Sequence, residues 1–117
     1  MLTDSVQTSI PANSTVNVFL GRPIEFIGTP SVARLLAAGD ALGLNMQWLI
    51  NVGGNQLAPI AAGSTVNVAS VAGAGPKDDE DTVATGVPIP AGARSQLNVT
   101  NTTAGAINFR YRAVILP

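Results

Sequence analysis

The residues best suited to hold an ion form one acidic run, Asp78–Asp81, in a stretch of small and polar residues. Hard cations such as Ca²⁺ bind several carboxylate and carbonyl oxygens, so the calcium candidates are Asp78, Asp79 and Asp81. The run lacks the alternate-position spacing and the closing Glu of an EF-hand loop. The surrounding stretch, Val71–Gly86, is predicted to be an exposed loop, and solvated charge without a metal is the favoured interpretation.

Few residues of the chain are suited to catalysis. The chain has no Cys and no His, which removes thiolate chemistry, the commonest general base and a partner for a serine nucleophile. The carboxylates outside the acidic run are Asp4, Glu25 and Asp40, and nothing in the sequence pairs them in one pocket. The glycines at Gly73–Gly75 lack the following helix of a phosphate-binding loop. We predict a protein that is not an enzyme and needs no cofactor.

Two aromatic residues and four polar ones are candidates for binding. Trp48 and Tyr111 could stack on sugars, but both lie in phase with aliphatic residues, which favours core packing. The outward side of the last predicted strand carries polar and basic residues, which either pair with acidic residues of a neighbouring subunit or are solvated. With one further arginine, the interface candidates are Arg22, Asn108, Arg110 and Arg112.

The charge of the chain limits its partners. Charged residues make up 11% of the sequence, against roughly 25% in typical proteins. The six basic residues form no cluster or tail, so direct binding of nucleic acid is disfavoured. No secretory signal and no apolar run of the ~18–20 residues that span a bilayer are recognised. So weakly charged a surface fits burial against other subunits, and equally a neutral polar surface that faces water. A homo-oligomer is the expectation that follows from the first of these.

Apolar and polar residues alternate along much of the chain, which is the pattern of half-buried β-strands. Gly53–Asn55 is predicted to be a hairpin turn, and "STVNV" at Ser14–Val18 and Ser64–Val68 marks two places where a turn leads into a strand. The last strand has the clearest alternation, with its inward side formed by Ile107, Phe109, Tyr111, Ala113 and Ile115. The predicted strands are Thr15–Leu20, Arg22–Ile27, Asn45–Val52, Thr65–Val71, Gln96–Thr100 and Ala106–Leu116.

One segment, Thr29–Asp40, favours a helix instead. Thr29 can cap it, Pro30 suits the first helical position, and Gly39 can end it. Its apolar residues also include three at helical spacing, Val32, Leu35 and Leu36. A short helix near residues 30–38 is therefore predicted between the strands.

Short strands separated by Gly/Pro turns predict an all-β fold: an antiparallel β-sandwich, specifically a single jelly roll of seven or eight strands. Residues 11–117 are expected to form this single domain. Residues 1–10 are treated as an N-terminal segment or arm that could add a strand to an adjacent subunit.

The stretch "PIPAGARSQLNVTNTTAGAINFRYRAVILP" (Pro88–Pro117) resembles virus and phage virion proteins, namely single jelly-roll capsid subunits and head-decoration proteins. The resemblance implies a non-enzymatic structural subunit of a virion that contacts copies of itself or other virion proteins. Residues 1–10 carry no basic side chain, which favours a decorating role or a shell separated from the genome. The alternative is a carbohydrate- or receptor-binding β-sandwich module of a phage fibre or cell-surface protein, which predicts exposed aromatic residues.

Overall fold

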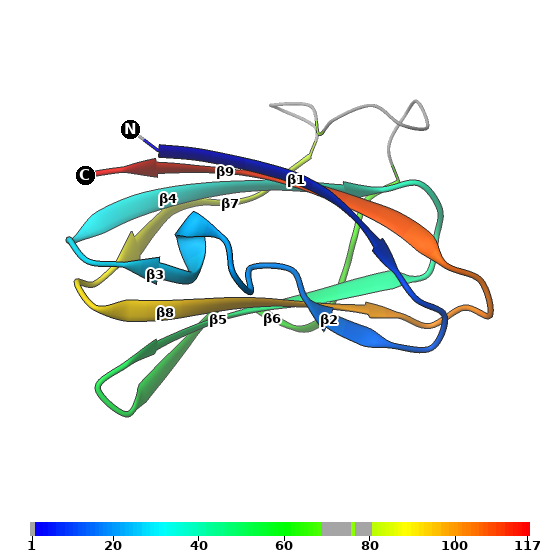
Figure 1. Cartoon of the computed structure of the whole chain (residues 1–117), viewed down its shortest axis with the longest axis horizontal. Coiled ribbons are helices and arrows are strands. Elements are labelled where there is room, and N and C mark those ends of the chain that lie inside the picture. Colours follow the sequence, from blue (N-terminus) through cyan, green and yellow to red (C-terminus); the bar gives the residue numbers. More distant parts are fainter. Residues whose placement is uncertain (1, 69–75, 77–80) are drawn as a thin grey trace.

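Two antiparallel β-sheets pack face to face (Figure 1) in this computed structural model, which describes residues 2–68, 76 and 81–117. Sheet A has the strand order β1-β9-β4-β7, and sheet B has the order β2-β8-β5-β6, with β3 also paired to β8. The predicted all-β sandwich is confirmed. The strands are β1 (Leu2–Ile10), β2 (Thr15–Asn17), β3 (Phe26–Ile27), β4 (Ser31–Gly39), β5 (Leu44–Val52), β6 (Asn55–Thr65), β7 (Thr82–Ile89), β8 (Ala93–Asn101) and β9 (Ile107–Leu116).

The core lies between the sheets and is built by alternation along β5, β8 and β9. Every second residue of these strands is buried, because successive side chains of a strand point to opposite faces. The predicted inward side of β9 is confirmed, and Trp48 and Tyr111 are core residues as favoured. The Phe19 ring meets Trp48 and Tyr111 edge-on, with ring centroids 6.2 and 5.1 Å away. Such aromatic pairs each add about 0.5–1.5 kcal/mol beyond area burial.

The helix predicted near residues 30–38 is wrong, because these residues form the strand β4. β4 lies between β9 and β7, and both neighbours hydrogen-bond to it. Residues on both of its faces are buried, Leu35 toward the core and Leu36 on the outer side of sheet A. A strand that is apolar on both sides does not alternate, so its continuous apolar run also fits a helical pattern.

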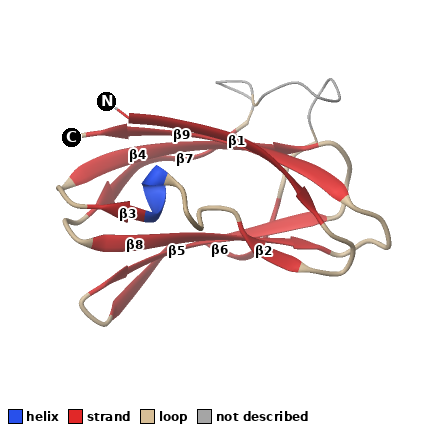
Figure 2. Cartoon of the chain, viewed as in Figure 1, coloured by secondary structure: helices blue, strands red, loops and turns tan. Residues whose placement is uncertain are grey.

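Two predicted strands near the N-terminus are shorter than expected. β2 ends at Asn17, and Leu20, the last residue of the predicted strand, is 70% exposed. The segment Arg22–Ile27 begins as the 3₁₀ turn η1 (Pro23–Glu25), and only its last two residues form β3. A proline has no amide hydrogen for a strand ladder, which explains this start. Figure 2 shows η1 between the two sheets, where Ile24 is buried.

Other boundaries differ from the sequence pattern as well. The predicted hairpin at residues 53–55 is confirmed as the turn that joins β5 to β6. β6 was missed over most of its length, since the strand predicted from Thr65 onward covers only its last residue. The predicted loop at residues 71–86 ends earlier than expected, because β7 begins at Thr82.

The segment set apart as a candidate arm is the edge strand β1. Leu2–Ile10 pairs antiparallel along its whole length with β9 of the same chain, from Leu2 opposite Ile115 to Ile10 opposite Ile107. In Figure 1, β1 runs beside β9 and then crosses toward β2 in the other sheet. The β1–β2 connection is therefore part of one end of the sandwich.

At that end of the sandwich, the side chain of Asn101 connects several segments by hydrogen bonds. Its Nδ2 donates to the carbonyl oxygens of Ile10 and Gly105, at 3.0 and 2.8 Å. Its Oδ1 accepts from the backbone N and the hydroxyl of Thr103, at 2.9 and 2.7 Å. Since Asn101 is fully buried, these bonds replace the water that its amide would otherwise need.

Candidate functional site

The outer side of sheet B carries mostly amide and hydroxyl side chains. Its residues pair directly across β5 and β8, as Asn45 does with Thr100 and Gln47 with Asn98. Further out, the hydroxyls of Thr15 and Thr100 are 2.8 Å apart. We call this surface the neutral face, and define it as Thr15, Asn45, Gln47, Leu49, Asn51, Arg94, Gln96, Asn98 and Thr100.

The neutral face carries one ionised side chain, Arg94, and it lies at the margin. Its guanidinium carbon is 5.2 Å from the centroid of the Phe26 ring, a cation–π arrangement. Phe26 is 51% exposed. The remaining polar groups of the face can bind a partner only through neutral hydrogen bonds and close packing.

The outer side of sheet A differs, because three of the six basic residues lie on β4 and β9 there: Arg34, Arg110 and Arg112. Arg110 was expected to point outward and does, yet it is only 4% exposed. Its Nη2 lies 2.5 Å from Asp40 Oδ1, and its Nε donates to Gln7 Oε1 at 3.2 Å. Among the described residues, its Nη1 has no hydrogen-bond partner. Arg110 therefore pairs with an acidic residue of its own chain.

The other interface candidates are placed as follows. Arg112 is half-buried and stands opposite Ser5 and Leu36 in the ladders of sheet A. Asn108 is exposed on the same side of β9, opposite Ser9. Arg34 of β4, which is not one of the interface candidates, lies on the same side of sheet A, and its Nη2 donates to Thr82 Oγ1 at 3.0 Å. The interface candidates of β9 thus share one surface.

Arg22 belongs to a third arrangement, between the sheets. Its Nη2 lies 2.5 Å from Oδ1 of Asp4, a residue of β1 that is 2% exposed. Tyr111 donates its phenol hydrogen to the other carboxylate oxygen at 2.8 Å. The hydrogen bond to Asp4 raises the pKa of Arg22. Burial, followed by the hydrogen bond to Asp4, raises the pKa of Tyr111 well above its ordinary value.

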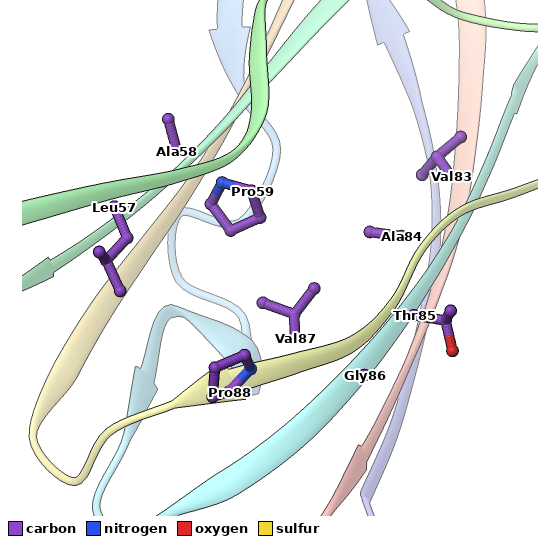
Figure 3. Close-up of a pocket in the computed structure, with 9 residues that line it drawn as sticks. All are labelled: Leu57, Ala58, Pro59, Val83, Ala84, Thr85, Gly86, Val87 and Pro88. Carbon is purple, nitrogen blue, oxygen red and sulfur yellow. The ribbon is translucent and has the colours of Figure 1, made fainter.

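A groove of about 490 Å³ lies between β6 and β7, the edge strands of the two sheets. Figure 3 shows Pro59 and Val87 in the space between these strands. None of the side chains that line the groove is ionisable, so the groove offers neither a general acid nor a general base. The lining residues are Leu57, Ala58, Pro59, Val83, Ala84, Thr85, Gly86, Val87 and Pro88.

The calcium candidates are only partly described. Asp78 and Asp79 lie outside the described residues. Asp81 is buried beside β7, and its backbone carbonyl accepts a hydrogen bond from the amide of Ala37 at 3.0 Å. Within the described ranges, no three acidic, His or Cys residues gather closely enough to hold a metal ion.

The carboxylates that could have formed a catalytic pair each bond to groups of their own chain. Asp4 is bound to Arg22 and Tyr111, and Asp40 is bound to Arg110. Glu25 accepts a hydrogen bond from the backbone of Gly21 at 3.4 Å. Each of these acids therefore has a structural partner in the chain.

Sequence reasoning missed the two ion pairs, although one signal was present. Asp4 shares the period-two phase of Val6 and Ile10, the inward side of β1. An acidic residue in an apolar phase indicates a buried carboxylate that needs a donor. Nothing in the sequence identifies Arg22 as that donor.

No described helix is long and apolar enough to cross a membrane. Comparison of the chain with protein-family models, with curated protein sequences and with solved structures found no match in any of the three.

Proposed function

We propose that this chain is a non-enzymatic structural protein of a virion, a capsid subunit or a capsid decoration protein, which self-associates or docks on a shell. The order in which the strands wrap carries the proposal. With β3 set aside, the strands from β1 to β9 lie in sheets A, B, A, B, B, A, B and A. This order supports a jelly roll, an eight-stranded double sheet used by viral capsid domains and by lectins.

The distribution of charge favours the structural use of this fold over ligand binding. Asp4 and Asp40 are held by arginines of their own chain, and the neutral face offers a partner almost no net charge. Association through such a face depends on packing and neutral hydrogen bonds, as in symmetric contacts between identical subunits.

The carbohydrate-binding alternative has less support. It predicts exposed aromatic rings on one face, whereas Trp48 and Tyr111 are buried in the core. Phe26 is an exposed ring, but Arg94 covers part of it. Saturable glycan binding by a monomer would favour this alternative over assembly.

Sedimentation equilibrium of the purified protein over a wide concentration range tests the proposal. A discrete oligomer or particle is expected, and its stability should change little between low and high salt because the neutral face lacks ion pairs. Electron microscopy of the same sample should show rings or shells.

A charge placed on the neutral face makes the test specific. Asn98→Arg should weaken association at least tenfold, because each symmetric contact would bury or oppose new charges. Thr3→Arg is the matched control on sheet A, where Thr3 is exposed, and it should leave association unchanged. A protein that stays monomeric at every concentration and binds no shell would refute the proposal.

A further inference from the structure

β1 has a neighbouring strand on one of its two edges only. It is the edge strand of sheet A, and its ladder partner is β9. Because β9 is its only ladder partner, β1 can leave and re-enter the sheet without breaking the ladder between any other two strands. What remains is an open β9 edge nine residues long.

That open edge is a specific binding site. The groups that bond to β1 all lie in other parts of the chain. Arg22 and Tyr111 bind the carboxylate of Asp4. Arg110 donates to the side-chain oxygen of Gln7, and Asn101 donates to the carbonyl oxygen of Ile10. The site therefore selects a strand that places a carboxylate between the sheets, beside Arg22 and Tyr111.

Within this chain, one strand meets that requirement. β1 carries Asp4, and the other strands of the described chain contain no acidic residue. An uncharged strand at this edge would leave the phenol of Tyr111 buried without its acceptor, which is costly. The best ligand for the site is therefore another copy of β1.

The connection between β1 and β2 can act as a hinge. It spans only Pro11–Ser14, and Asn13 has a positive φ of 52°. Asn13 is the one non-glycine residue of the described chain with a positive φ. Short strained turns favour exchange of the flanking element, because an extended hinge releases the strain while every strand contact is kept.

We propose that two copies of this chain exchange β1, so that β1 of each copy pairs with β9 of the other and inserts Asp4 between Arg22 and Tyr111 of that copy. The proposal rests on the proposed self-association and adds a second contact between copies, on sheet A, to the contact through the neutral face of sheet B. Reciprocal exchange forms a twofold dimer without any new surface.

Disulfide trapping tests the exchange directly, because the chain has no cysteine. Ser9 and Asn108 are exposed and directly opposite in the β1–β9 ladder. Opposed residues of antiparallel strands have Cα atoms about 4.5–5.5 Å apart, within the range of a disulfide. Ser9→Cys and Asn108→Cys are placed on separate full-length chains, co-expressed, purified and oxidised.

Exchange predicts a covalent dimer on a non-reducing gel, because the two thiols then meet across the subunit boundary. The out-of-register pair Thr3→Cys with Asn108→Cys is the matched control, since Thr3 stands opposite Val114, roughly 20 Å along the strand from Asn108. A double variant with both cysteines on one chain confirms that the two positions can be joined.

Three outcomes are distinguishable. A covalent dimer for the in-register pair alone supports the exchange. A discrete oligomer by sedimentation that yields no covalent dimer overturns the exchange and leaves the proposed function standing. A protein that is strictly monomeric and yields no covalent dimer overturns both.

Discussion

The phenol of Tyr111 donates a 2.8 Å hydrogen bond to the carboxylate of Asp4, and both side chains are buried between the sheets. The bond joins two neighbouring strands, since Tyr111 lies on β9 and Asp4 on β1. Arg22 supplies the positive charge from the segment before η1. The edge strand is thus fastened by a polar contact inside the sandwich as well as by its ladder.

Replacement of Asp4 by Asn should lower the free energy of unfolding. The neutral amide is a weaker acceptor for Tyr111, and it abolishes the ion pair with Arg22. A hydrogen bond to a charged group contributes about 1.5–3 kcal/mol, so a loss of about 1–2 kcal/mol is expected. Urea denaturation measures it, with Ser5→Ala on the exposed side of β1 as the control. Equal stability of both variants would contradict this role.

Alkaline pH should destabilise the protein through Tyr111. Its pKa is raised in the folded chain above the ordinary value of 10.0, first by burial and then by the hydrogen bond to Asp4 and the charge of Asp4. As the pH rises past about 10, the unfolded chain loses the phenol proton before the folded chain does, so the free energy of unfolding falls. Below that pH, this contribution to stability is complete.

The chain contains one tyrosine, so tyrosinate absorbance reports Tyr111 alone. Ionisation should coincide with unfolding as followed by circular dichroism. The Tyr111→Phe variant should be less stable at neutral pH, by about 1–2 kcal/mol, and its stability should depend less on pH above 10. Ionisation near the ordinary value in the folded protein would refute the assignment.

Replacement of Asn101 by Ala should cost about 2–3 kcal/mol. The change removes the amide donor to the carbonyls of Ile10 and Gly105 and the acceptor of the Thr103 amide, although the Thr103 hydroxyl can still donate to Gly105. Asn101→Asp should not restore stability, since a carboxylate cannot donate to the two carbonyls. Asn98→Ala on the neutral face is the control and should change stability by less than about 0.5 kcal/mol. Thermal unfolding compares the three variants.

Gly43 should tolerate no side chain. Its φ is +113°, and an added Cβ would overlap the methyl group of Thr103. The hydroxyl of Thr103 is bonded to Asn101, which prevents the methyl group from rotating away. Gly43→Ala should lose about 2–4 kcal/mol from backbone strain and overpacking together.

The control for that variant is Gly54, which also has a positive φ, +87°, but open space where a Cβ would lie. Gly54→Ala should show the backbone strain alone, about 1–2 kcal/mol. Chemical denaturation of both variants separates the steric effect from the conformational one. A smaller loss for Gly43→Ala than for Gly54→Ala would contradict the predicted overlap.

The all-β class and the strands with one polar side could be predicted from the sequence alone. β5 and β9 alternate because one of their faces packs in the core and the other does not. The period of two is a property of the strand backbone, so it can be read without knowledge of the neighbouring strands. The inward positions of Trp48 and Tyr111 follow from the same phase.

The strands without alternation could be recognised only from their neighbours in the folded chain. β4 is buried on both sides and fits a helical pattern, whereas β6 is exposed along most of both sides and shows no pattern at all. The tertiary structure is likewise needed to identify which polar side chains bond to each other. Asp4 and Arg22 are 18 residues apart in sequence, and Asp40 and Arg110 are 70 apart. Local periodicity reports which side of a strand is buried, but only the wrapping of the strands brings distant charges together.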